Sequence, residues 1–278
     1  MTIKLYIDTN IFLDFYQSGN DRLGVFKELI NRASDIIITE QTINEFYRNR
    51  SQRLSELAKK IQAAASPRIH YTSVVRELSQ FRAWEKAHHD GEAAAKLMAK
   101  TLMDWTKHHD HDVVLAEFKS LVSSSKVLPI TDNTIERAKQ RKILGNPPTS
   151  PDKHTIGDEL IWEILQENVT DELIIVSRDY TFLENEAILV SEFSNKGSKK
   201  LVRITESLSE ALKLLGKPSK PIEEAEKEVV KGIRLERLNQ SGDACPKCGT
   251  AMEDTGFDGS DQGDAHWLTC PSCGHEEC

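Results

Sequence analysis

The sequence predicts an α/β protein in which a central parallel β-sheet lies between two layers of helices, followed by a small cysteine-containing module at the C-terminus. Two observations support this prediction. Short apolar runs, each about as long as a buried strand, alternate with longer segments of helical periodicity. All five cysteines fall after residue 244, so the preceding domain contains none. The main domain is therefore expected to fold around an apolar core without disulfides.

The N-terminal part of the chain alternates strands with helices. The apolar run at residues 3–7 is expected to be the first strand, and residues 21–32 carry apolar side chains at helical spacing. Residues 35–39 ("DIIIT") read as a second strand, and a long helix is expected over residues 42–65. Residues 74–124 are charged and helical in pattern.

The second half continues the alternation. A helix is expected over residues 132–144, where "GNPPTSP" ends it, and another over residues 155–166. Strands are expected at residues 172–177 and 201–204, and residues 207–215 form a closing helix. In parallel sheets built this way, ligands bind beyond the carboxyl ends of the strands.

The chain therefore divides into three parts. The main domain is expected at residues 1–215, with a helical insertion at about residues 66–130. Residues 216–240 have interleaved charges and few large apolar side chains, which is typical of a linker. The last part, residues 241–278, carries eight acidic side chains against one basic, whereas the preceding residues are nearly neutral.

Composition excludes a membrane protein and favours a reducing compartment. The 278 residues contain no run of about 18 apolar residues that could span a bilayer. The N-terminus leads directly into a strand pattern instead of a signal peptide. Because the main domain has no cysteine to oxidise, we expect a cytoplasmic protein.

Four carboxylates stand where the predicted topology would bring them together. Asp8 follows the first strand, and Asp179 follows the strand at 172–177. Glu45 and Asp158 lie near the starts of two helices. Carboxylates held close together cannot all stay ionised without a cation, and hard oxygen ligands suit one or two Mg²⁺ or Mn²⁺ ions. Such ions can polarise a phosphodiester, activate a water and stabilise the leaving oxygen.

Each of these acids also has a purely structural interpretation. Thr42 with Glu45, and Thr155 with Asp158, have the spacing of a capping box, in which the acid only closes the helix start. Asp8 and Asp179 would be turn or cap residues at strand ends. The metal-site hypothesis is favoured because all four are expected at the same edge of the sheet.

Four segments around these acids resemble the PIN-domain ribonucleases: "YIDTNIFLD", "TINEFYRNR", "TIGDELIWEIL" and "IIVSRDYTFL". The resemblance covers roughly residues 1–215, and the "GNPP…IGDELIW" run is similar to a bacterial branch with a longer helical insertion. It implies that the four acids bind the metal ions and that the activity is metal-dependent cleavage of RNA. It also implies that Asn10 and Ser177 orient the acids. The region between Glu45 and Asp158 is longer than in the small toxin members, so their substrates and partners do not transfer.

Several basic residues lie near the predicted crevice in sequence and are candidate phosphate contacts. They are Arg48, Arg50, Lys153 and His154. Arg53, Lys139, Arg141 and Lys142 share the same segments. The alternative is that all of these side chains form solvated helix surfaces.

The C-terminal module has the spacing of a four-thiolate zinc site. Cys245 and Cys248 form one C-x-x-C pair, and Cys270 and Cys273 form a second after 21 intervening residues. "CPKCG" and "CPSCG" resemble the knuckles of zinc ribbons, and a module of about 38 residues needs such a metal to fold. Because it is acidic, we expect it to dock a protein partner; Cys278 is left as a free thiol.

Three functions are therefore compared. The first is a metal-dependent endoribonuclease, with DNA left open as a substrate and with homo-oligomers left open. The second is a phosphatase of the haloacid-dehalogenase type, which needs an aspartate two residues after Asp8, where this chain has Asn10. The third is a non-catalytic binding module whose acids only cap helices.

Overall fold

The computed structural model describes residues 2–16, 23–65, 72–151, 153–195 and 199–227, and three strands within residues 253–277. The chain forms two compact units, Met1–Ile222 and Glu223–Cys278. No helix in the described ranges is both long and apolar enough to cross a membrane.

The first unit is built on a parallel sheet, which confirms the predicted α/β class. Among the described residues the sheet has five strands in the order β3-β2-β1-β4-β5. Their bounds are β1 Ile3–Ile7, β2 Ile36–Thr39, β3 Lys126–Leu128, β4 Glu172–Val176 and β5 Leu201–Thr205. The chain adds β2 and β3 on one side of β1 and then adds β4 and β5 on the other. The strand order therefore reverses between β1 and β4, which is where parallel sheets open a crevice for ligands.

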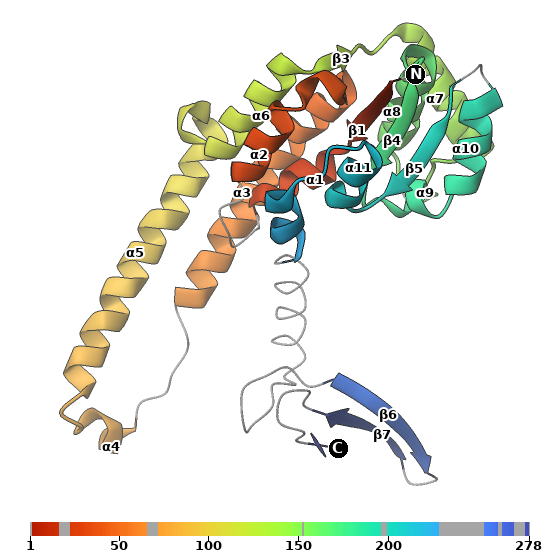
Figure 1. Cartoon of the computed structure of the whole chain (residues 1–278). Coiled ribbons are helices and arrows are strands. Elements are labelled where there is room, and N and C mark those ends of the chain that lie inside the picture. The colour runs from red at the N-terminus through yellow and green to blue at the C-terminus, as the bar shows by residue number, and fades with distance from the viewer. Residues whose placement is uncertain are drawn as a thin grey trace. The chain divides into compact units, whose positions relative to one another are not determined.

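Eleven helices have defined bounds in the described part of the first unit (Figure 1). They are α1 Thr9–Leu13, α2 Leu23–Ile30, α3 Glu40–Ala65, α4 Ser73–Arg76, α5 Phe81–Lys107, α6 Val113–Ser124, α7 Asp132–Leu144, α8 Gly157–Asn168, α9 Tyr180–Leu183, α10 Glu186–Asn195 and α11 Leu208–Leu214.

Helices cover both faces of the sheet. Consecutive residues of a strand point to opposite faces, and in the central strands both sets of residues are largely apolar. On one face Tyr6, Ile37 and Ile175 pack in a single core cluster with residues of α7, α8 and α10. The other side has an aromatic cluster, in which the Phe46 and Phe118 rings stack with centroids 3.9 Å apart and Phe12 lies edge-on to Phe118. The central strands β2, β1 and β4 are thus largely buried on both faces.

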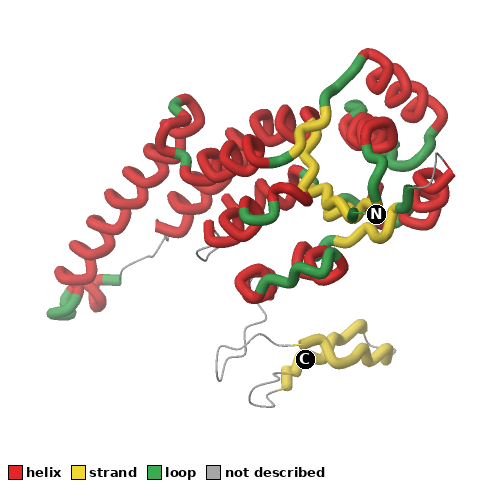
Figure 2. The backbone as a smooth tube through the Cα atoms, turned by 45° about the horizontal axis from the view of Figure 1, so that its top comes forward, coloured by secondary structure: helices red, strands yellow, loops and turns green. Residues whose placement is uncertain are grey.

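The insertion forms a helical arm. Helices α3 and α5 lie side by side and extend away from the sheet (Figures 1 and 2). A buried ion pair joins α3 to the start of α6, since Arg50 Nε of α3 donates to Asp112 Oδ2 at 2.5 Å and Asp112 caps α6. The Tyr16 hydroxyl donates to the same oxygen at 2.7 Å.

Some elements differ from the sequence-based expectation. The long helix starts at Glu40 and not at residue 42, and α8 starts at Gly157 and not at residue 155. The strand β3 was not expected, because it has three residues and two of them are exposed. Helices α9 and α10 lie between two expected strands, in a segment for which no element was predicted.

The second unit contains an antiparallel sheet of β6 Glu253–Ser260, β7 Gly263–Thr269 and β8 Glu276–Glu277. The register pairs Glu253 with Thr269 and Leu268 with Glu277. Cys245, Cys248, Cys270 and Cys273 lie outside the described residues. The predicted zinc site therefore stays a prediction.

Candidate active site

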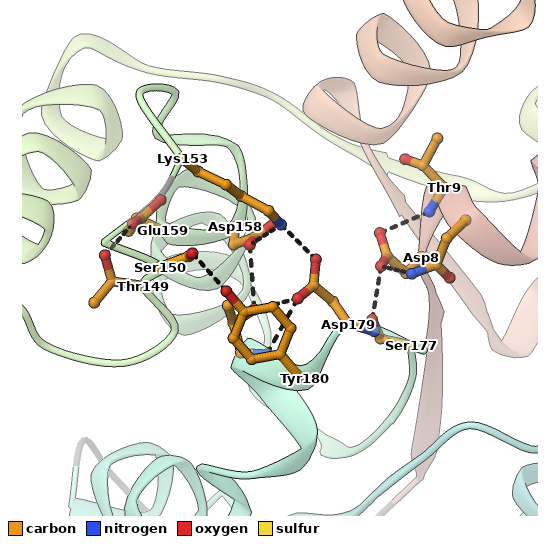
Figure 3. A network of polar contacts seen from close by, with 12 residues as sticks. Asp8, Thr9, Thr149, Ser150, Lys153, Asp158, Glu159, Ser177, Asp179 and Tyr180 are labelled. Atoms are coloured by element: carbon orange, nitrogen blue, oxygen red, sulfur yellow. Dashed lines mark hydrogen bonds and ion pairs between the residues drawn. The ribbon is translucent and has the colours of Figure 1, made fainter.

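Asp8 lies directly beyond the carboxyl end of β1 and is almost fully buried. Its carboxylate caps α1, accepting a hydrogen bond from the Thr9 amide at 2.7 Å. Its other oxygen accepts from Asn10 Nδ2 at 2.8 Å and from the Ser177 hydroxyl at 2.7 Å (Figure 3). Ser177 follows β4, which pairs with β1 along its whole length. The two neighbouring strand ends therefore hold this side chain from both sides.

Asp158 and Asp179 form a second pair on the α8 and β4 side of the crevice. The Lys153 ammonium donates to Asp158 Oδ2 at 2.9 Å and to Asp179 Oδ2 at 2.6 Å (Figure 3). The Thr181 hydroxyl contacts both carboxylates as well, at 3.1 and 3.0 Å. One cation and one hydroxyl thus hold these two acids together.

Glu45 approaches the same place from α3. Its carboxylate accepts from the Thr9 hydroxyl at 3.3 Å and from Gln41 Nε2 at 2.8 Å. It also lies directly against Gly157, at the start of α8. A Cβ atom at that position would overlap Glu45 Oε1, so the carboxylate can keep its present position only beside a glycine and would otherwise have to move.

These contacts close into a ring. Asp8 is joined through Ser177 to the Asp179 amide, which donates to the Ser177 hydroxyl at 3.0 Å. Asp179 is joined through Thr181 to Asp158. Asp158 follows Gly157 in the chain, and Glu45 packs against Gly157. Thr9 closes the ring, because its hydroxyl donates to Glu45 and its amide donates to Asp8. The structure therefore links all four acids that the sequence placed at one edge of the sheet through a continuous series of contacts.

Burial and mutual repulsion determine the charge of this ring. Burial, opposed by the Ser177 hydrogen bond but reinforced by the charges of Glu45 and Asp158, raises the pKa of Asp8 to about 7. Burial likewise raises the pKa values of Glu45 and Asp158. Burial also acts on Asp179, but the Lys153 ammonium outweighs it and the pKa of Asp179 is lowered. The site therefore concentrates acidic groups whose negative charge the Lys153 ammonium neutralises only in part.

The donor set suits a hard divalent cation. All four acids supply oxygen ligands, which Mg²⁺ and Mn²⁺ prefer. Asn10 Oδ1 is buried and has no hydrogen-bond partner among the described residues, so it is a further unused oxygen beside Asp8. Within those residues no group of three or more acidic, histidine or cysteine side chains is drawn together as a metal site. Lys153, which lies between two of the acids, takes the place of a counter-ion.

The capping interpretation holds for two acids only. Asp8 and Asp179 cap α1 and α9, each accepting from a backbone amide. Glu45 lies in the second turn of α3, and the N-cap of α8 is Ile156, which has no side-chain cap. Neither expected capping box at Glu45 or Asp158 is formed. Burial of these two carboxylates therefore lacks the structural reason that a cap would give.

The basic residues fall into different environments. Arg48 is exposed and lies 3.5 Å from Glu45, and His154 is exposed before α8. Lys153 reaches the site itself. The expectation for Arg50 is wrong, because its side chain is 1% exposed and paired with Asp112. Arg141 is similarly buried between two glutamates, so neither guanidinium is available to a phosphate.

Sequence reasoning missed three members of the ring. Thr9 and Thr181 each join two parts of it, and Gly157 provides space for Glu45. All three lie next to an acid that was identified, within one or two positions. Small or hydroxyl residues beside a candidate ligand were the available signal.

The sequence model of the PIN domain matches residues 5–182, from β1 to α9. This region contains the whole ring of acids and the arm. No curated protein and no solved structure matches the chain significantly.

Proposed function

This chain belongs to the PIN-domain family, whose members are typically metal-dependent nucleases, and on that premise we propose that it is a metal-dependent endoribonuclease. Asp8, Glu45, Asp158 and Asp179 would hold one or two Mg²⁺ or Mn²⁺ ions. When bound, such ions polarise the phosphodiester and lower the pKa of the attacking water.

The remaining residues position the acids. The Ser177 hydroxyl donates to Asp8 and accepts a hydrogen bond from the Asp179 amide, so it fixes the separation of the ends of β1 and β4. Thr181 does the same for Asp158 and Asp179. Asn10 donates its amide to Asp8 and leaves its own oxygen free. These contacts preorganise the oxygen ligands before substrate arrives.

The observation that carries the proposal is the closed ring of carboxylates at the strand-order reversal between β1 and β4. A non-catalytic module would need its acids as helix caps, and Glu45 and Asp158 cap nothing. A phosphatase of the haloacid-dehalogenase type would need a carboxylate at Asn10. The nuclease proposal gives one role to all four acids, the buried Asp8 and the half-buried Glu45, Asp158 and Asp179.

The test is cleavage of labelled single-stranded RNA, structured RNA and DNA, with Mn²⁺, with Mg²⁺ and with chelator. Cleavage of RNA is expected with either metal and none with chelator. Asp8→Asn and Asp158→Asn should reduce the rate at least a hundredfold, while Asp90→Asn, an exposed change on α5, should leave it unchanged. Metal-independent cleavage, or full activity in Asp8→Asn, would refute the proposal, and cleavage of DNA alone would change the substrate.

For the second unit we propose a structural Zn²⁺ held by Cys245, Cys248, Cys270 and Cys273. In sequence, the two cysteine pairs flank the hairpin of β6 and β7, which is the order of a zinc ribbon. Metal analysis should find one zinc per chain, lost in Cys270→Ser and retained in Cys278→Ser. We expect this acidic unit to bind a protein and not RNA, because phosphates would be repelled.

A further inference from the structure

Helix α5 carries its basic residues along one side. At 3.6 residues per turn, five of them fall within an arc of roughly 80°. They are Arg82, Lys86, Lys96, Lys100 and Lys107. His89 falls in the same arc, and one carboxylate, Asp104, lies at its edge. We call these five side chains the basic ridge.

The side chains of the basic ridge are exposed and are not held in ion pairs with described residues. Several other cations of this unit are paired, as Arg137 is with Glu163 and Lys142 is with Glu159. Helix α5 also carries Glu85, Asp90, Glu92 and Asp104, so the excess of positive charge is confined to the side of the helix that carries the ridge.

Packing fixes the direction in which the ridge faces. Ala95 and Ala99 are buried and lie on the side of α5 that packs on α3. The ridge lies about a third of a turn away from them, so it is clear of this interface. From Arg82 to Lys107 it spans roughly 37 Å along the helix axis.

The arm connects the ridge to the acidic site. Glu45 lies on α3, and five residues further along Arg50 Nη2 donates to the Trp105 carbonyl of α5 at 2.6 Å. The Lys107 end of the ridge is therefore next to the part of α3 that carries Glu45. The Arg82 end lies towards the tip of the arm (Figure 1).

We propose that the basic ridge binds the phosphate backbone of nucleic acid at a distance from the acidic site, and this rests on the proposed nuclease function. Lysine and arginine contacts to phosphate give affinity without sequence preference. A row of such contacts holds a long strand along the arm. A short oligonucleotide that fills only the acidic site does not reach most of the ridge.

Binding is measured in the Asp8→Asn background, so that the RNA stays intact, by fluorescence anisotropy over a series of salt concentrations. The test variant is Lys96→Gln, Lys100→Gln, Lys107→Gln. The control has the same loss of charge at exposed lysines off the ridge: Lys27→Gln, Lys119→Gln, Lys126→Gln. Thermal unfolding verifies that both variants are folded.

For a long RNA, the test variant should bind at least tenfold more weakly. The negative slope of log K against log salt should become shallower by about 2, because three phosphate contacts are lost. The control should keep the wild-type slope. With active protein, cleavage of a short oligonucleotide should be unchanged in the test variant. Equal slopes in the test variant and the control would overturn the proposal that the ridge binds phosphates. Wild-type binding without any cleavage would refute the nuclease proposal and leave the ridge standing.

Discussion

The ammonium nitrogen of Lys153 lies 2.6 Å from Oδ2 of Asp179, just beyond the carboxyl end of β4. The same nitrogen lies 2.9 Å from Asp158. The loop that carries Lys153 is itself anchored, since Thr149 donates to Glu159 at 2.6 Å and the Ser150 hydroxyl lies 2.5 Å from the Tyr180 hydroxyl (Figure 3). The position of the ammonium is therefore determined by the fold.

Lys153→Met should increase the affinity for Mn²⁺ about tenfold, because a divalent ion no longer competes with the ammonium for Asp158 and Asp179. The metal-free variant should melt at a lower temperature, since the two carboxylates lose their counter-charge. Calorimetric titration and thermal unfolding measure the two effects. Lys139→Met, at an exposed helix position, is the control. Unchanged Mn²⁺ affinity in Lys153→Met would show that the ammonium does not occupy the cation position.

Metal-free stability should fall as the pH rises from 5 to 7. An unfolded aspartate titrates near pH 4, and burial raises the pKa of Asp8 to about 7 in the folded protein. Between pH 4 and pH 7 Asp8 therefore carries a proton in the folded state but not in the unfolded state. Rising pH removes this stabilisation, by about 2 kcal/mol from pH 5 to pH 7. The lowered pKa of Asp179 has the opposite sign but acts below pH 4.

Urea unfolding with chelator at pH 5, 6 and 7 measures this dependence. Asp8→Asn cannot titrate at this position, so its stability should change less with pH and should exceed that of the wild type above pH 7. A wild-type stability that is flat or rising over this range would mean that Asp8 stays ionised in the folded protein.

That Asp8 and Asp179 lie close together could be predicted from a local signal in the sequence, whereas the role of the four acids as metal ligands stays a prediction. Asp8 and Asp179 end apolar runs, and parallel strands bring such ends together. The position of Lys153 could not be predicted in the same way, because it depends on contacts of Thr149 and Ser150 with residues on other elements. No local sequence pattern predicts these contacts.

Arg50 shows the opposite failure. In the sequence it reads as a candidate phosphate contact or, alternatively, as part of a solvated helix surface. Its burial is made possible by Asp112, which is 62 residues later and on another element. Strand β3 was missed for a related reason, since three residues with two exposed side chains carry no strand periodicity. Pairing with β2, and not propensity, makes it a strand.

Gly157→Ala should impair the site without unfolding the protein. The added methyl group would overlap the Glu45 carboxylate and displace it from the ring. Activity should fall at least tenfold, and the stabilisation by Mn²⁺ should weaken. Gly91→Ala is the matched control, because nothing lies within 4 Å of a Cβ at that position of α5. That change should stabilise the helix by about 0.5–1 kcal/mol. Equal activity of both variants would mean that the position of Glu45 is not important.

Arg50→Met should be the most destabilising of these changes. It leaves the Asp112 carboxylate buried with only the Tyr16 hydroxyl and the Leu115 amide as donors. Breaking one side of a buried pair costs about 3–5 kcal/mol. Denaturant unfolding should show this loss, whereas Arg48→Met, at an exposed side chain, should change stability by less than about 1 kcal/mol.

The double variant Arg50→Met, Asp112→Asn separates pairing from packing. Removing the second charge should recover part of the loss, because the uncompensated carboxylate is then gone. If the two single losses simply add, the two side chains do not interact energetically. In that case the arm would be attached to the sheet domain by the packing of Phe46 on Phe118 and its aromatic neighbours, and not by the ion pair.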